Sequence, residues 1–284
     1  MENQLRCVMF NREEFLIEHQ LDADVLFLLE GLYQYGVRVL NLDGKTTKED
    51  MEEKLLQAGY RTEETLLIAA EDATIAFVNQ KKNGQTYSAA DIVVEGFEEV
   101  DFYFLERIYQ RKHGLPWRVI ETERTYLREM TVEDVDALYE IYAQEGMTDF
   151  IEPLCEKRED EIAYTKAYIE NMYVYYGYGM WLVCDRENGE IIGRAGLNTQ
   201  EIEDEIVLEM GYLIRQEYQR QGYAYEVCTA IMDYAKEASG FSELSCLVEE
   251  ENHPSLGLLQ KLGFSFQKEV DILGKRMKRY VYAL

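Results

Sequence analysis

A glycine loop between a strand pattern and a helix pattern near the C-terminus is the strongest constraint on the fold. Residues 205–214 alternate apolar side chains with others at a period of two, which indicates a strand. Residues 223–235 repeat apolar side chains at helical spacing. Between them, Gly222 allows close approach of backbone N–H groups to phosphate oxygens, and the helix N-terminus adds its positive dipole end. This order predicts a pyrophosphate cradle, although an ordinary strand–turn–helix has the same pattern. The predicted cradle consists of Gln219, Arg220, Gln221, Gly222, Tyr223 and Ala224.

A second pattern follows the expected strand 244–249. The run Asn252-His253-Pro254-Ser255 supplies a cap for a short helix, and Gly263 supplies a left-handed end for it. Phe264 then begins another strand. Alone, this segment would be read as a capped helix.

The two patterns together, in this order, resemble the GNAT acetyltransferase superfamily, in particular its ribosomal-protein and small-molecule N-acetyltransferases. The run 125–131 resembles the family's opening strand and first helix cap, and 209–214 resembles its fourth strand. The resemblance covers residues 118 to 284. It implies acetyl-CoA as cosubstrate and an amine as acceptor, either a small molecule or a peptide.

The resemblance also implies roles for individual residues. Leu213, Ile214 and Arg215 would pair with the pantetheine arm of the cofactor as an added strand does, and the backbone N–H near Leu213 or Ile214 would face the thioester oxygen. Asn252 and Ser255 would contact the arm where the fourth and fifth strands splay apart.

Glu209, on the fourth strand, is the expected general base, acting through a water molecule. The alternative is a solvated strand carboxylate. Many family members have a tyrosine as general acid directly after the position of Leu258, but here Leu259 stands there. The acid is therefore unassigned: either another tyrosine serves, or the thiolate, a good leaving group, departs without one.

The acceptor pocket is expected near a tyrosine-rich segment. Tyr178 and Trp181 supply aromatic faces, and Asp149 and Glu152 supply carboxylates in the preceding loop. Carboxylates with aromatic faces suit an ammonium group. The alternative is that these aromatic residues fill the core between helix and sheet.

Composition limits the partners. Lys and Arg number 29 against 55 Asp and Glu, a net charge of −26, which opposes binding to nucleic acid or anionic membranes. Five cysteines without Cys-x-x-Cys spacing are typical of reduced thiols in a cytoplasmic protein, and three scattered histidines predict no metal site. The sequence predicts neither a signal peptide nor a membrane helix.

Residues 1–117 are expected to form a separate α/β domain with a parallel sheet covered on both faces. Expected strands and helices alternate here. The strands are 37–40, 66–70 and 92–94, and the helices are 48–58, 73–83 and 100–112. Gly114 and Pro116 are suitable boundary residues.

This first half resembles a trimmed haloacid-dehalogenase-like domain. Asp43 and the pair Glu71-Asp72 are its only candidate acidic residues, and Asn41 stands where the nucleophilic aspartate of such phosphatases would be expected. A catalytically silent accessory domain is therefore favoured over an active phosphatase.

The predicted fold class is thus α/β: a small parallel-sheet domain at 1–117, haloacid-dehalogenase-like or Rossmann-like, and a GNAT-fold domain at 118–284 with a mixed central sheet flanked by helices. In the second domain, helices are expected at 131–142 and 159–173 and an Asn188-Gly189 hairpin joins strands 180–185 and 190–197. A last strand is expected at 275–282.

The predicted function is transfer of an acetyl group from acetyl-CoA to a primary amine by direct attack in a ternary complex. A phosphatase acting through the first domain, or a cofactor-binding sensor without transfer activity, are the alternatives.

Overall fold

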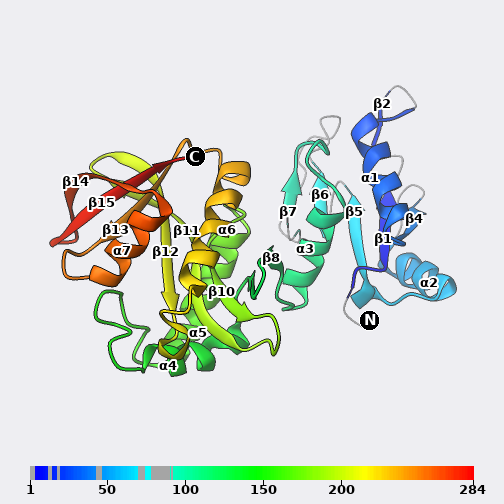
Figure 1. Cartoon of the computed structure of the whole chain (residues 1–284). Coiled ribbons are helices and arrows are strands. Elements are labelled where there is room, and N and C mark those ends of the chain that lie inside the picture. The colour runs from blue at the N-terminus through cyan, green and yellow to red at the C-terminus, as the bar shows by residue number, and fades with distance from the viewer. Residues whose placement is uncertain are drawn as a thin grey trace. The chain divides into compact units, whose positions relative to one another are not determined.

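The chain folds into two compact units, Met1–Leu115 and Pro116–Leu284. The computed structural model describes residues 4–11, 15–17, 20–42, 47–69, 74–77, 90 and 92–284. Figure 1 shows the elements of each unit. In the described part of the chain, no helix is long and apolar enough to cross a bilayer, and no three His, Cys, Asp or Glu residues gather as metal ligands would.

The first unit is a parallel five-stranded sheet covered on both faces, as the sequence predicts. Its strand order is β4-β1-β5-β6-β7, and every neighbouring pair is parallel. Val8 and Phe10 of β1 face the cluster formed with α1 and α3, whereas Cys7 and Met9 face α2. The strands are β1 (Cys7–Asn11), β4 (Arg38–Leu42), β5 (Thr65–Ala69), β6 (Ile75–Phe77) and β7 (Ile92–Val94), with a small hairpin of β2 (Leu16–Ile17) and β3 (Gln20–Leu21). The helices are α1 (Ala23–Gln34), α2 (Lys48–Ala58) and α3 (Phe102–Lys112), and η2 (Thr62–Glu64) is a short 3₁₀ turn.

The predicted helix over 73–83 is wrong where the structure describes it. Ile75–Phe77 form β6, which pairs with β5 on one side and β7 on the other, and Ile75 and Ala76 are completely buried. Tertiary pairing overrides local helix propensity at this short apolar run. The acidic candidates Asp43, Glu71 and Asp72 lie outside the described residues.

The second unit is built on an eight-stranded mixed sheet in the order β14-β15-β13-β12-β11-β10-β9-β8. Every neighbouring pair is antiparallel except β12 with β13. The strands are β8 (Arg118–Glu121), β9 (Thr125–Arg128), β10 (Met180–Asp185), β11 (Ile191–Ile202), β12 (Glu205–Ile214), β13 (Glu243–Val248), β14 (Ser265–Ile272) and β15 (Lys275–Ala283). The helices and turns are η3 (Val132–Asp134), α4 (Val135–Tyr142), α5 (Arg158–Tyr168), η4 (Ile169–Tyr173), η5 (Gln216–Tyr218), α6 (Tyr223–Ala238) and α7 (His253–Leu262).

Local sequence signals set several of these boundaries. Thr131 and Asp134 bond reciprocally as a capping box before α4, and Gly263 ends α7 in the left-handed conformation with φ of 88°. The predicted helix 159–173 is α5 followed by one π-helical turn. The predicted strand 190–197 is longer, because β11 pairs with the whole of β12.

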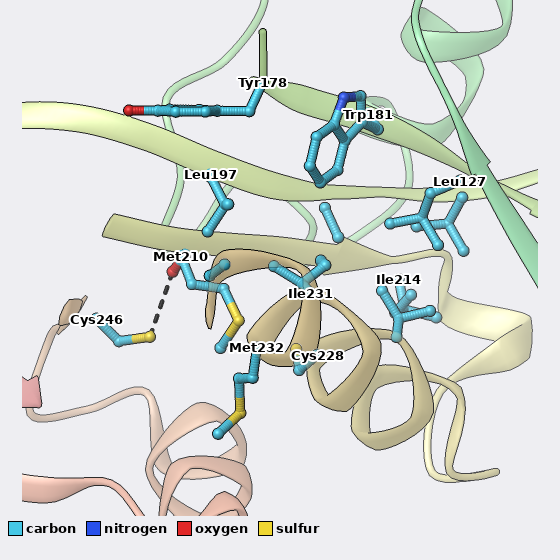
Figure 2. Close-up of a cluster of buried hydrophobic side chains, with 14 of the residues drawn as sticks. Leu127, Tyr178, Trp181, Leu197, Met210, Ile214, Cys228, Ile231, Met232 and Cys246 are labelled. Atoms are coloured by element: carbon cyan, nitrogen blue, oxygen red, sulfur yellow. Dashed lines mark hydrogen bonds between the residues drawn. The ribbon is translucent and has the colours of Figure 1, made fainter. Parts of the chain in front are cut away.

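The core of the second unit lies where α6 packs on the sheet. Figure 2 shows Cys228, Ile231 and Met232 of α6 beside Met210 and Leu197 of the neighbouring strands. The three α6 positions repeat at helical spacing, and Leu197 and Met210 are directly paired across two strands, so one apolar stripe meets one apolar face.

Arg279 of β15 fastens the beginnings of β12 and β13. It is 1% exposed, and its guanidinium donates to Glu205 (2.7 Å), Glu243 (3.1 Å) and Ser245 (3.0 Å). A buried guanidinium needs such partners to offset its desolvation. Its contacts hold β12 and β13 together only at the end where both strands start.

Candidate active site

Strands β12 and β13 separate beyond Glu209. Their parallel register is limited to Leu208↔Leu244 and Glu209↔Ser245, although β12 continues to Ile214. One side-chain contact follows the last pair: Cys246 Sγ lies 3.3 Å from Met210 O, as the dashed line in Figure 2 shows. The splayed half of β12 therefore offers main-chain groups that β13 does not satisfy.

Alternation along β12 identifies those main-chain groups. In an antiparallel pair, successive residues direct their N–H and C=O groups to opposite sides of the strand. Arg215 N–H bonds to Ile192 O on the β11 side (2.7 Å), and Met210 O faces β13. Tyr212 and Ile214, in step with Met210, therefore face the gap, whereas Leu213 faces β11. Of the two N–H groups considered for the thioester oxygen, the Ile214 N–H points to the gap.

The predicted cradle lies at the end of β12, where the chain enters α6. Gly222 is the N-cap residue, with φ of 87°, and no side chain caps the helix. The first intrahelical bond runs from Glu226 N–H to Gly222 O, so the preceding N–H groups at 223–225 have no acceptor within the helix. This arrangement is suited to an anion, because unpaired N–H groups and the helix dipole converge there.

The other cradle side chains hold the loop in shape. Gln219 Nε2 donates to Ile214 O (2.8 Å), and Gln221 Nε2 donates to Glu217 O (2.6 Å). Arg215 pairs with Glu190 (2.5 Å) and Glu217 (2.7 Å). Arg220 has a positive φ of 57°, which a non-glycine residue adopts only at some cost. The side chains of Gln219, Gln221 and Arg215 therefore support the loop, and the N–H groups at the start of α6 are left for a ligand.

Arg124, in the turn between β8 and β9, is a cradle residue that sequence reasoning missed. Its Nη1 donates to Gln221 O (3.0 Å), and its guanidinium lies 4.1 Å from the centre of the Tyr223 ring. It also binds both carboxylate oxygens of Glu226. Because Arg124 precedes the cradle by almost a hundred residues, no local pattern could have connected them.

Helix α7 brings the second sequence pattern to the gap. Asn252 caps it by accepting a hydrogen bond from Ser255 N–H (3.2 Å). The Ser255 hydroxyl lies beside the phenol of Tyr212. Burial raises the pKa of that phenol well above its usual value, and the hydrogen bond from Ser255 acts in the opposite direction. Leu259, at the position of the expected proton donor, is fully buried.

Glu209 lies at the point where the strands separate. It is half-buried, opposite Asn198 of β11, on the face of the sheet that also carries Gly211 and Leu213. Among the described residues, none donates a hydrogen bond or forms an ion pair with its carboxylate. Burial raises the pKa of Glu209 from 4.5 to about 7. A carboxyl group with this pKa can accept a proton at neutral pH.

The four predicted acceptor residues do not gather around Glu209. Trp181 is fully buried and packs edge-on against Tyr234 of α6, 5.1 Å between ring centres. It pairs with Ala195, which in turn pairs with Tyr212, so it lies on the face opposite Glu209. Tyr178 is 6% exposed and its hydroxyl bonds to Thr199 (2.7 Å). Both occupy the core, as the alternative interpretation had it.

Asp149 and Glu152 lie in the loop between α4 and α5 and are exposed to solvent. Residues 143–157 form this loop, which leads into α5 and then into η4. The two carboxylates are free to meet a cation from solution, but among the described residues no contact joins them to Glu209.

Comparisons with known proteins agree with this geometry. Residues 124–265 match the family model described as "Acetyltransferase (GNAT) domain", which is half of the chain. The N-acetyltransferase YoaA of Bacillus subtilis strain 168 is 29% identical over 153 residues, 53% of this chain and 84% of its own. The protein YkkB of the same organism is 30% identical over 95 residues, 34% of this chain, and the match spans 55% of YkkB.

A solved structure shares the fold of the second unit. The GNAT-family acetyltransferase of Bordetella pertussis superposes with a TM-score of 0.50 at 23% identity, covering 59% of this chain and 100% of its own. The splayed strands, the glycine cradle and the matched family model lead to one conclusion: the chain belongs to the GNAT acetyltransferase family, enzymes that use acetyl-CoA as cosubstrate.

Proposed function

We propose that the second unit transfers the acetyl group of acetyl-CoA to a primary amine by direct attack in a ternary complex. The observation that carries this proposal is the position of Glu209. A carboxyl group with a pKa of about 7 stands where β12 leaves β13, beside main-chain groups that no strand satisfies. A base and a row of free backbone donors are what acyl transfer to an ammonium substrate requires.

The cofactor-binding residues follow from this assignment. The backbone of Gln219–Ala224 and the first N–H groups of α6 would hold the pyrophosphate, with Arg124 fixing the loop. The gap-facing C=O of Tyr212 and N–H of Ile214 would bond to the pantetheine arm, and Asn252 and Ser255 would bound the opposite side. The Leu213 and Arg215 backbones support β12 from the β11 side.

Glu209 would take the proton of the acceptor ammonium through a water molecule, and the neutral amine would attack the thioester carbon. The Tyr212 N–H would stabilise the oxyanion that develops on the carbonyl oxygen, because a strand rises about 3.4 Å per residue and the Ile214 N–H lies roughly 17 Å along β12 from Glu209. The carbon–sulfur bond then breaks, the thiolate of CoA leaves, and the second proton of the attacking nitrogen passes to the thiolate or to water. Leu259 gives α7 no proton donor, so we assign no general acid.

The acceptor would be a small-molecule or peptide amine that enters from the face of Glu209 and Asn198. The exposed carboxylates of Asp149 and Glu152, and the net charge of −26, favour the approach of a cation. Nucleic acid and anionic membranes are disfavoured by the same charge, and we infer a cytoplasmic location.

We infer that the first unit is an accessory domain without phosphatase turnover. Its strand order has β1 between β4 and β5, and ligands of such sheets bind at the carboxyl ends of the strands. Asn11 ends β1 and Asn41 lies next to the end of β4, and neither amide is a nucleophile. Magnesium-dependent hydrolysis of p-nitrophenyl phosphate, lost in Asp43→Asn, would refute this inference.

The decisive experiment combines binding and turnover on the full chain. Acetyl-CoA should raise the melting temperature in a concentration-dependent way, because a ligand that binds only the folded state stabilises it. A panel of amines is then screened for release of free CoA thiol. Binding without release from any amine, including polyamines and peptides, would support a sensor. No binding of acetyl-CoA would sink the proposal.

A further inference from the structure

A glycine pair interrupts the face of the sheet on which Glu209 lies. Gly196 of β11 and Gly211 of β12 are directly paired, one step along the same face from the pair Asn198 and Glu209. The backbone of Gly179 and Met180 crosses over Gly196 so closely that a Cβ there would lie 2.0 Å from Gly179 O. No residue with a side chain fits at Gly196 without moving that strand.

The Met180 side chain covers the second glycine. A Cβ on Gly211 would lie 3.3 Å from Met180 Cε and 3.4 Å from Met180 Sδ. The thioether thus rests on the β12 backbone in the next position after Glu209 on this face. It fills the space that a side chain at position 211 would otherwise occupy.

Two tyrosines fix the backbone that carries this side chain. Met180 N–H donates to the hydroxyl of Tyr168 (2.7 Å), and the hydroxyl of Tyr173 donates to Met180 O (2.6 Å). Tyr173 is fully buried, and burial raises the pKa of its phenol. The main chain of Met180 is therefore held on both sides, while its unbranched side chain remains adaptable.

From this geometry we propose that Met180 limits the size of the acyl group that the enzyme accepts. The inference rests on the proposed function, which puts the thioester carbon within reach of both Glu209 and the gap-facing N–H of Tyr212. Gly211 lies between those two features, so the carbon chain of the acyl group extends towards Gly211. The Met180 thioether closes that space after the acetyl methyl.

The consequence is a preference for acetyl-CoA over longer acyl-CoA thioesters. Each methylene added to the acyl chain must displace Sδ and Cε of Met180 from the β12 backbone. A pocket with a fixed wall discriminates about 10–200-fold per methylene, and an adaptable methionine should give the lower part of this range.

The test measures affinities of CoA, acetyl-CoA, propionyl-CoA and butyryl-CoA by calorimetry on the full chain. Wild type should bind butyryl-CoA at least roughly tenfold more weakly than acetyl-CoA. Met180→Ala should abolish this difference and bind butyryl-CoA about tenfold more tightly than wild type does, with CoA affinity unchanged. Met277→Ala, a half-buried methionine of β15 in a separate cluster, is the matched control and should keep the wild-type order.

A second variant protects the test against misfolding. Met180→Phe should lose affinity for acetyl-CoA but keep affinity for CoA, which has no acyl group. The inference is overturned if wild type does not discriminate, or if folded Met180→Ala keeps the wild-type ratio of acetyl-CoA to butyryl-CoA. If wild type binds neither CoA nor acetyl-CoA, the proposed function fails as well, and the two failures are thereby distinguished.

Discussion

Arg124 binds both carboxylate oxygens of Glu226 in the first turn of α6. Its backbone N–H donates to Oε1 (2.8 Å) and its Nε donates to Oε2 (2.7 Å). The hydrogen bond to Glu226 raises the pKa of Arg124. Burial acts to raise the pKa of Glu226, but the hydrogen bonds from Arg124 and Thr122 outweigh it and lower that pKa. Together with the bond to Gln221 O, this contact connects the β8–β9 turn to the loop that we propose holds the pyrophosphate.

Arg124→Lys should weaken acetyl-CoA binding by about tenfold and leave kcat nearly unchanged. Lysine keeps the charge but loses the planar, multidentate donor geometry that holds Glu226 and Gln221 at once. The measurement is KM and kcat for acetyl-CoA at saturating acceptor.

Arg186→Lys is the matched control for this substitution. Arg186 contacts the same turn through Thr122 O (2.8 Å), and within the described part of the chain it pairs with Glu121 (3.2 Å) rather than with the cradle. Equal effects of the two substitutions on KM would show that Arg124 acts through general stability of the turn.

Gly222→Val should abolish measurable acetyl-CoA binding in a folded protein. The φ of 87° disfavours a β-branched residue, and the new side chain would lie at the mouth of the cradle, its Cβ 3.4 Å from Arg124 Nη2. Gly240→Val is the control, because Gly240 also has a positive φ, 72°, but open space around it. Calorimetry with acetyl-CoA compares the two. Binding that survives in Gly222→Val would exclude the cradle as the pyrophosphate site.

The sequence predicts best those features that depend on neighbouring residues. The bounds of β12, α2 and β10 follow from alternation and caps, and the structure has them at the expected residues. The helix predicted over β6 failed because pairing with two neighbouring strands placed this segment, in which Ile75 and Ala76 are completely buried. Neither β1 nor α1 was predicted, although β1 is flanked on both sides by parallel strands.

In the site too, features set by neighbouring residues could be predicted and features set by distant parts of the chain could not. The cradle and the Asn252 cap are local patterns and could be located from the sequence. Asn198 and Met180 reach the site through strand pairing, and Arg124 reaches it through a side-chain hydrogen bond, so their positions required the fold. Trp181 was a plausible aromatic residue for the acceptor pocket, but its position in the alternation of β10 places its side chain on the face of the sheet opposite Glu209.

Glu209→Gln should lower the rate of acetyl transfer by roughly 10²–10⁴-fold near neutral pH, without loss of acetyl-CoA binding. The wild-type rate should rise with pH through the Glu209 pKa of about 7, because the carboxylate form is the base. In the variant this inflection should disappear, and the deficit should shrink at high pH, where more of the amine is already neutral. pH–rate profiles of both proteins test this. If the pH–rate profiles of wild type and Glu209→Gln coincide, Glu209 is not the general base, and Asp149, Glu152 or bulk water takes that role.

The same substitution should stabilise the protein at alkaline pH. The folded-state pKa of about 7 lies above the ordinary value of 4.5, so ionisation of Glu209 favours the unfolded state. Wild type should therefore lose stability as the pH rises from 4.5 through 7, and the loss should be complete above that range. A tenfold change in an acid dissociation constant corresponds to about 1.4 kcal/mol, so Glu209→Gln should gain at most about 3 kcal/mol over wild type at pH 8 and almost nothing at pH 4.5.

Urea unfolding of both proteins at pH 4.5 and pH 8 measures this difference. Glu201→Gln, which removes an exposed carboxylate of β11, is the control and should follow wild type at both pH values. If the difference in unfolding free energy between Glu209→Gln and wild type is the same at pH 4.5 and pH 8, the Glu209 carboxylate is solvated in the folded protein. A gain in stability confined to high pH, together with the loss of turnover, would show that the half-buried carboxyl group of Glu209 serves catalysis at the expense of stability.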